Sequence, residues 1–136
     1  SLHDALPICN VEFLGYKSGE ELLEIIRNAA VTVYPSIWFE NCPMSIIESK
    51  CLGVPVIGSN IGGIPELIND NVDGLIFEPD NFMDLADKIK SIINDDYNLD
   101  RLSKNCLQDY EKRFTAKEHY KHLIKIYTNC LNNRVE

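Results

Sequence analysis

The sequence predicts an α/β fold in which a parallel sheet is flanked by helices. Short apolar, β-branched runs alternate along the chain with longer segments whose apolar residues recur at helical spacing. Glycine and proline punctuate these runs at regular intervals. Strands that alternate with helices form βαβ units, and such units build a parallel sheet with helices on its faces. The 136 residues suit one compact domain.

The expected strands are short and rich in Val, Ile and Phe, and they cover residues 11–15, 31–36, 55–60 and 73–79. The expected helices lie between and after them, at residues 18–29, 43–52, 65–70, 80–95, 99–114 and 115–131. The last two helices follow one another with no strand between them. We therefore expect them to form a C-terminal appendage that packs over the sheet or over a further part of the protein.

Local signals define each element of the first half in turn. The run VEFLG, residues 11–15, predicts a strand because it is apolar and ends in a glycine. Ser18 and Glu21 have the spacing of a capping box at the start of the next helix. VTVYPS is β-branched and predicts a buried strand. Pro43 in the first turn and Gly53 after the last turn are typical of a helix between them.

The second half follows the same logic. PVIGSN and DGLIFEP predict two further strands, and the first of them leads into a glycine turn and a short helix. Asp80 or Asn81 caps the helix that follows the second. Thr115 and Glu118 have the spacing of another capping box, at the start of the final helix.

Composition excludes several classes of protein. The net charge is -8, and a nucleic-acid binder needs clustered Lys and Arg, so no nucleic-acid partner is expected. The five cysteines are widely spaced without a CxxC pair, which predicts neither a zinc site nor a disulfide framework, and most are expected to be small buried hydrophobes. Residues 1–10 show no periodicity and are assigned to a leader of doubtful origin, while residues 11–136 form the domain.

The stretch ENCPMSIIE is the first candidate site. Glu40 lies after an expected strand, and Glu48 lies inside the following helix. Ligands of open parallel sheets sit beyond the carboxyl ends of the strands, and a helix start offers free N–H groups to a phosphate. A diphosphate with hydroxylated groups on both sides, as in a nucleotide sugar, would use all of these features. The alternative is that both glutamates are solvated and Glu48 only favours helix formation.

The glycine turn NIGGIPE is the second candidate. Gly62 and Gly63 would allow a backbone to approach a ligand closely, although a plain tight turn explains them equally well. Other site chemistries have less support, because GxGxxG, Walker and nucleophile-elbow patterns are absent from the sequence. His119 and His122 are interpreted as part of a partly exposed helix face rather than as a metal pair.

Residues 35–81 resemble the C-terminal domain of retaining glycosyltransferases that have the two-domain GT-B fold, especially the large family four. The residues that carry the resemblance are, in order, Pro35-Ser36, Glu40, Glu48, Gly53-Val54-Pro55-Val56, Gly62-Gly63 and Glu66. It implies a Rossmann-like sheet and a truncated C-terminal half of a GT-B fold. One departure is Asn41-Cys42-Pro43, where many members of the family have Gly-Phe-Gly.

The resemblance also implies roles for individual residues. Glu40 would act as the catalytic residue beside the donor sugar, and Glu48 would accept hydrogen bonds from the ribose. Further donor-binding residues would be Asn41, Cys42, Pro43, Met44, Ser45, Tyr16, Gly62 and Gly63. Tyr16 would lie on the loop that binds the base. The donor would be a UDP, GDP or ADP sugar, transferred with retention and without a cofactor or an obligatory metal.

Full members of this family also have an N-terminal acceptor domain. The chain is therefore expected to be a fragment that binds the donor and is inactive alone, acting in the cytoplasm or at the inner face of the membrane. Self-association through exposed apolar surface is a further expectation. The alternative function is a non-catalytic module of the same fold that binds a nucleotide or docks to a partner subunit.

Overall fold

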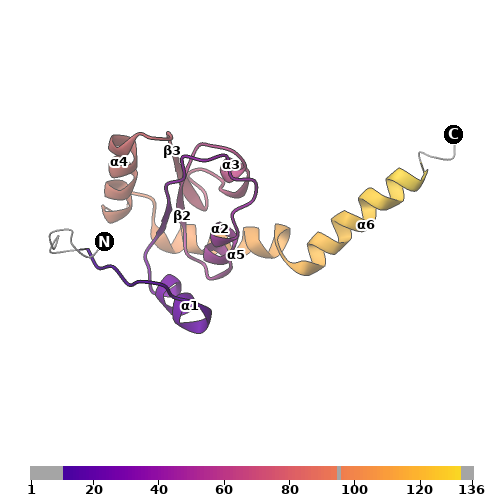
Figure 1. Ribbon diagram of the computed structural model, residues 1–136, viewed down its shortest axis with the longest axis horizontal. Helices are drawn as coiled ribbons and strands as arrows, with labels where there is room; N and C mark the ends of the chain where they lie inside the picture. Colours follow the sequence, from indigo (N-terminus) through magenta and orange to yellow (C-terminus); the bar gives the residue numbers. More distant parts are fainter. Residues whose placement is uncertain (1–10, 95, 133–136) are drawn as a thin grey trace.

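The computed structural model describes residues 11–94 and 96–132 (Figure 1). Within these ranges the strands are β1 (Thr32–Tyr34), β2 (Val56–Ser59) and β3 (Gly74–Phe77). The helices are α1 (Gly19–Arg27), α2 (Met44–Cys51), α3 (Ile64–Leu67), α4 (Phe82–Ile93), α5 (Leu99–Arg113) and α6 (Ala116–Asn132). The strands form one parallel sheet in the order β1-β2-β3, which confirms the predicted α/β class.

The core lies on both faces of the central strand β2. Val56 packs with Ile46 of α2 and with the apolar residues of α3 on one face. Ile57 points the other way and packs with Ile92 of α4 and Leu102 of α5. Because both faces are covered by helices, every residue of β2 is buried. For this reason the run VPVIGS shows no alternation of apolar and polar residues.

The predicted strand at residues 11–15 was wrong. These residues belong to no ladder among the described strands, and Val11, Phe13 and Leu14 are exposed. Strand propensity stabilises a strand only when a neighbouring strand satisfies its backbone groups. In Figure 1 this segment runs outside the sheet toward α1, and β1 is an edge strand. The expected leader, residues 1–10, lies outside the described residues.

The helix caps agree only in part with the sequence prediction. Ser18 is the N-cap of α1, but its side chain makes no cap hydrogen bond, so the predicted capping box was wrong. Glu21 instead forms an ion pair with Lys17 one turn earlier. Asn81 caps α4 as predicted, since its side chain accepts a hydrogen bond from the Asp84 N–H over 3.1 Å.

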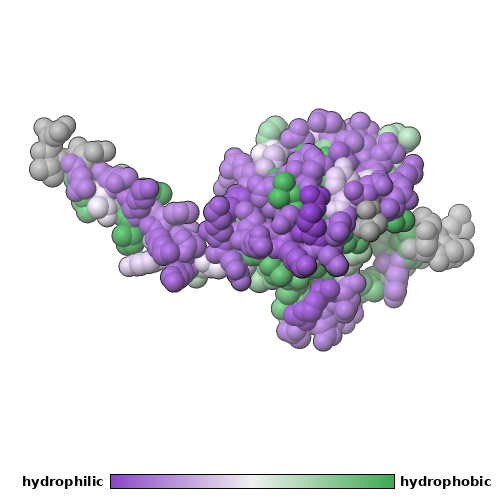
Figure 2. Space-filling model, turned by 180° about the vertical axis from the view of Figure 1, so that it is seen from behind, coloured by the Kyte–Doolittle hydropathy of each residue, from purple (hydrophilic) through white to green (hydrophobic). Residues whose placement is uncertain are grey.

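The two C-terminal helices behave differently. The first, α5, packs against α2, while α6 extends away from the body and buries none of its residues (Figure 1). Thr115 accepts a hydrogen bond from the Glu118 N–H over 3.3 Å, and the Glu118 carboxylate pairs with Lys121 instead of closing a capping box. Apolar groups lie along the projecting helix in Figure 2. The exposed ones are Tyr120, Leu123, Ile124, Ile126, Tyr127 and Leu131. No helix among the described residues is long and apolar enough to span a bilayer.

The expectation that most cysteines are buried was wrong. Among the described residues, Cys106 is buried, whereas Cys42, Cys51 and Cys130 are exposed. The Cys106 thiol donates a hydrogen bond to the Asp73 carbonyl over 2.9 Å. Burial, followed by the nearby Asp73 carboxylate, raises the pKa of Cys106 to about 12. Only the deprotonated thiolate is a good nucleophile.

Cys106 is therefore expected to resist alkylation in the folded protein. At pH 8 with iodoacetamide, Cys51 is expected to be modified readily while Cys106 remains free until the protein unfolds. Peptide mapping by mass spectrometry at timed intervals measures each site separately. Equal rates at Cys106 and Cys51 in the native protein would contradict the buried position of the Cys106 thiol.

Candidate functional site

The loop between β1 and α2 has a hydrogen-bonded backbone. Ser59, buried in β2, donates its hydroxyl to the Ser36 carbonyl over 2.6 Å. The Trp38 N–H donates to the Ser36 hydroxyl over 3.2 Å, and the Glu40 N–H donates to the Trp38 carbonyl over 2.9 Å. These bonds fix Glu40 just beyond the carboxyl end of β1, where ligands of parallel sheets bind.

The glycine turn after β2 packs directly on this loop. The Gly63 N–H donates to the Glu40 carbonyl over 2.7 Å. A Cβ at Gly62 would lie 2.5 Å from the Glu40 carbonyl oxygen, and a Cβ at Gly63 would overlap the Asn41 carbonyl oxygen. The two glycines are therefore required by loop packing. The structure brings together Glu40, Asn41 and the glycine turn, all predicted site residues.

Helix α2 begins beside these loops. Pro43 is its N-cap, in an extended conformation, and so lies one residue before the first helical turn in which it was predicted. No side chain caps this helix start. The first N–H groups of α2, beginning at Met44 and Ser45, have no partners within the helix and carry the positive end of its dipole. Cys42 and Met44 are exposed here. This helix start can accept an anionic group.

Glu48 lies on an exposed flank of α2. Together with Met44 it lines a hollow of about 230 Å³ between α1, α2 and α5. The other lining residues are Leu23, Ile47, Cys51, Leu52, Tyr110 and Phe114. The hollow is mainly apolar, and Glu48 is its one carboxylate. In Figure 2, apolar surface gathers where α1 meets the body.

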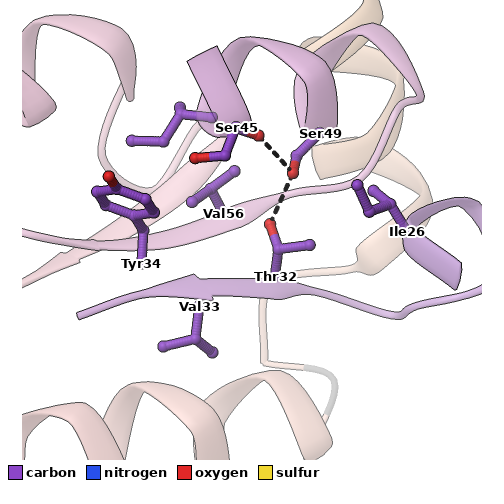
Figure 3. Close-up of a pocket in the computed structure, with 8 residues that line it drawn as sticks. Ile26, Thr32, Val33, Tyr34, Ser45, Ser49 and Val56 are labelled. Carbon is purple, nitrogen blue, oxygen red and sulfur yellow. Dashed lines mark hydrogen bonds between the residues drawn. The ribbon is translucent and has the colours of Figure 1, made fainter. Parts of the chain in front are cut away.

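Ser45 lines a second hollow, of about 120 Å³, between α2 and β1 (Figure 3). The Thr32 hydroxyl donates to Ser49 over 3.0 Å, and the Ser49 hydroxyl donates to the Ser45 carbonyl over 2.9 Å. Figure 3 shows the Tyr34 ring and Ser45 on the same side of β1, with Val33 on the other. These hydroxyl bonds join α2 to β1 and thereby hold the helix that carries Glu48.

Tyr16 lies apart from these groups. It belongs to the extended segment before α1, its side chain is 92% exposed, and it makes no hydrogen bond with another described residue. Its assignment to a base-binding loop stays a prediction. His119 and His122 are exposed on α6, as expected. Among the described residues, no group of three His, Cys, Asp or Glu side chains is arranged to hold a metal ion.

Sequence reasoning missed a buried charge cluster. Lys50 of α2 is fully buried, and its ammonium donates to the Leu67 carbonyl over 2.7 Å. It also pairs with Asp73 over 3.0 Å and with Asp109 over 2.6 Å. Arg113 adds a second cation, bonding Asp109 over 3.2 Å. Lys50 and Asp73 are fully buried, Asp109 is nearly so and Arg113 is half-buried, and each charge in the cluster faces one of opposite sign.

This charge cluster connects α2, α3 and α5. Besides the Lys50 bond to the carbonyl of α3, Arg113 donates to the Glu66 carbonyl over 2.6 Å. Burial of Asp109 favours its protonated form, but hydrogen bonds and charge from Lys50 and Arg113 outweigh it, so the pKa of Asp109 lies below its ordinary value. The spacing of Lys50 from the buried Ile46, one helical turn, is the only local signal of its burial.

Residues 2–109 match the family described as Glycosyl transferases group 1. The chain belongs to this family. The match includes Glu40, Glu48, the glycine turn and Lys50, and it ends at Asp109. It confirms the family expected from the order of Glu40, Glu48 and the glycine turn.

Two curated relatives show how the chain compares with longer members of the glycosyl transferases group 1 family. It is 30% identical over 126 residues to N,N'-diacetylbacillosaminyl-diphospho-undecaprenol alpha-1,3-N-acetylgalactosaminyltransferase of Campylobacter jejuni, covering 90% of this chain and 32% of that protein. It is 28% identical over 123 residues to UDP-Gal:alpha-D-GlcNAc-diphosphoundecaprenol alpha-1,3-galactosyltransferase of Escherichia coli, covering 89% and 30%. The chain spans about a third of the length of these relatives.

Solved structures of other proteins have the same fold. Sucrose-phosphate synthase from Thermosynechococcus elongatus matches with a TM-score of 0.77 and 26% identity, over 93% of this chain and 31% of that one. Anabaena Alr3699/HepE in complex with UDP matches with a TM-score of 0.80 and 21% identity, over 89% of this chain and 33% of that one. The C-terminal domain of a glycosyl transferase group 1 family protein from Francisella tularensis matches with a TM-score of 0.68 and 23% identity, over 76% of this chain and 53% of that one. The Rossmann-like fold of a GT-B C-terminal domain is thus confirmed.

Proposed function

We propose that this chain is the donor-binding part of a retaining glycosyltransferase and that it binds a UDP, GDP or ADP sugar. The observation that carries the proposal is the convergence of three features at the carboxyl edge of the sheet. These are the Glu40 loop, the glycine turn hydrogen-bonded to it through Gly63, and the uncapped start of α2. The UDP complex of the Anabaena protein, which shares this fold, supports a nucleotide donor.

In the proposed reaction, the bond between the anomeric carbon and the diphosphate breaks, a bond from that carbon to an acceptor hydroxyl oxygen forms, and the hydroxyl proton passes to the leaving diphosphate. Positive charge therefore develops on the sugar and negative charge on the leaving group. The Glu40 carboxylate stabilises the positive charge on the sugar, and the N–H groups that begin α2 stabilise the negative charge on the leaving diphosphate. Groups that act on charges formed only in the transition state raise the rate rather than the ground-state affinity. Glu48 accepts hydrogen bonds from the ribose hydroxyls. No cofactor and no obligatory metal take part in this scheme.

The acceptor side of the reaction belongs to the longer protein in this proposal. The two bacterial relatives are named for transfer to diphospho-undecaprenol-linked sugars, and each is about three times as long as the matched region. We therefore assign acceptor binding mainly to an N-terminal domain and propose that this chain alone does not turn over. The acceptor is a glycan, a lipid or another molecule, and the reaction takes place in the cytoplasm or at the inner face of the membrane.

A second candidate function is a docking module of the same fold. It is favoured by α6, whose apolar residues are exposed and none of whose residues is buried. In this role α6 would pack on a partner subunit or on a second copy of the chain. Measurable sugar transfer to any acceptor by the chain alone would contradict both the docking role and the proposed lack of turnover.

Calorimetric titration with UDP, GDP and ADP tests the donor proposal. One nucleotide is expected to bind, and Glu48→Gln is expected to weaken it about tenfold, because a charged hydrogen-bond acceptor becomes neutral. Glu111→Gln, an exposed change on α5, is the matched control and should leave the affinity unchanged. Absence of binding by all three nucleotides to the folded chain would reject the donor site proposed here.

A further inference from the structure

Helix α3 is a single turn that joins the candidate site to the charge cluster. Its N-cap is Gly63, whose N–H donates to the Glu40 carbonyl over 2.7 Å, so α3 begins at the junction between the glycine turn and the Glu40 loop. Its last two residues are Glu66 and Leu67. At a rise of about 1.5 Å per residue, only about 6 Å of helix separates its two ends. A shift at the end of α3 is therefore passed on to its start.

The end of α3 is held by two cations from other helices. The last carbonyls of a helix have no partners within it, and one turn of helix is not stable by itself. Arg113 of α5 donates to the Glu66 carbonyl over 2.6 Å, and Lys50 of α2 donates to the Leu67 carbonyl over 2.7 Å. Cations at this end of a helix also interact favourably with its dipole. The two side chains together act as the C-terminal cap of α3.

Both cations are themselves fixed in position. Asp109 pairs with both, over 2.6 Å to Lys50 and 3.2 Å to Arg113. The centroid of the Phe114 ring lies 5.5 Å from the Lys50 ammonium and 4.6 Å from the Arg113 guanidinium, within the range of cation–π contacts. Asp73 holds Lys50 from a further direction over 3.0 Å. Cations fixed in this way set the position of the carbonyls that they bind.

We propose that Arg113, with Lys50 beside it, is a positioning residue that holds the glycine turn against the Glu40 loop through α3. This role in donor binding rests on the proposed function, which places Glu40 and the start of α2 at the donor. Lys50 also belongs to α2, two residues after Glu48, so the same cation fixes α2 against α3. The charge cluster thus connects the two elements between which the donor would bind.

Amide hydrogen exchange in the native chain, measured residue by residue by NMR, tests this coupling. Arg113→Met removes the donor to the Glu66 carbonyl but keeps a side chain of similar length, and Arg113 is only half-buried, so the variant is expected to fold. Exchange of the Gly63 N–H is expected to become about tenfold faster, the effect of losing one hydrogen bond from a charged donor. The amides of β2 exchange only when the whole domain opens, so their rates should change far less.

Arg101→Met is the matched control. Arg101 also lies on α5 and donates to backbone carbonyls, but these belong to Asn71 and Tyr97, outside α3. This variant should leave exchange at Gly63 unchanged. If Arg113→Met accelerated exchange at Gly63 and in β2 by the same factor, Arg113 would stabilise the domain as a whole, and the proposal would be overturned. Native exchange at Gly63 in Arg113→Met would overturn it as well.

Calorimetry with the nucleotide that binds gives the functional readout. Arg113→Met is expected to weaken binding about fivefold, because the Glu40 loop must then be ordered when the ligand arrives. Arg113→Lys, which keeps one charged donor, should fall between this variant and the native protein, and Arg101→Met should bind like the native protein. Native affinity in Arg113→Met would overturn the role of Arg113 in donor binding.

Failure of this proposal is separable from failure of the donor site. A chain that binds nucleotide, with no selective change of Gly63 exchange in Arg113→Met, keeps its proposed function and loses the positioning role. A chain that binds no nucleotide loses the donor site. Selectively faster Gly63 exchange in Arg113→Met would then still support the coupling through α3, because that measurement needs no ligand.

Discussion

Replacement of Lys50 by methionine is expected to lower the free energy of unfolding by about 3–5 kcal/mol, the range found when one partner of a buried ion pair is removed. Methionine has a similar volume, so the apolar packing is kept while the ammonium is lost. Asp73, which is buried, and Asp109 then lose the cation that both contact. Urea unfolding followed by circular dichroism measures the loss as a lower midpoint.

Two variants separate the charge effect from general disruption. Lys90→Met removes the cation of an exposed pair with Asp87 and should change stability by less than about 1 kcal/mol. Adding Asp73→Asn to Lys50→Met should recover part of the loss, because one of the uncompensated charges is also removed. Unchanged stability of Lys50→Met, or no recovery in the double variant, would contradict the role of the charge cluster.

The charge cluster also predicts how the difference in stability between Lys50→Met and the native protein depends on pH. The pKa of Asp109 in the folded protein lies below its ordinary value of 3.8 because the cations favour its charged form. Its contribution to stability is therefore present above that value and is lost as the pH falls through the lower folded pKa. Lys50→Met loses most of this contribution. The gap in the free energy of unfolding between this variant and the native protein should therefore narrow as the pH falls below about 4.

Gly63→Ala is expected to cost about 1–3 kcal/mol, the range for overpacking a well-filled site. The added methyl group would occupy the position of the Asn41 carbonyl oxygen. The glycine turn and the Glu40 loop would have to separate, which would lengthen the hydrogen bond from the Gly63 N–H to Glu40. If the donor binds at this junction, nucleotide affinity should fall as well, and calorimetry together with urea unfolding measures both effects.

Gly19→Ala is the matched control for this change. Gly19 has a positive φ of +60°, but a Cβ there would meet no atom within 4 Å. The substitution should therefore cost only the conformational strain of a left-handed residue, about 1–2 kcal/mol, and leave nucleotide affinity unchanged. If Gly63→Ala behaved like the native protein in both measurements, the packing of the two loops would not matter for the site.

Much of the fold could be predicted because its signals are local. The strands at Thr32–Tyr34, Val56–Ser59 and Gly74–Phe77 fall inside predicted runs, and Asn81 was among the expected caps. Residues 11–15 have the same kind of signal but no ladder partner among the described strands. A short apolar run does not reveal whether a neighbouring strand will pair with it, and that pairing decides whether a strand forms.

The contacts within the candidate site could not be predicted from the sequence. The sequence indicated Glu40 in one candidate site and Gly62 and Gly63 in another, and the structure brings them together at one edge of the sheet. The sequence could not reveal that both glycines pack against the backbone of the other loop so closely that a Cβ would have no room. The burial of Lys50 was also out of reach, because Asp73 and Asp109 lie 23 and 59 residues away in the chain. Lysine in a helix is usually solvated, and only tertiary packing shows otherwise.

The distance along the chain between Lys50 and Asp109 has a consequence for the kinetics of folding. Contacts between residues 59 positions apart require a long loop to close, so we expect this pair to form late, after the sheet has assembled. Interactions that are absent from the transition state mainly slow unfolding and have little effect on the folding rate. The cluster would then extend the lifetime of the native state, and Lys50→Met would raise the unfolding limb of a chevron plot while leaving the folding limb nearly in place.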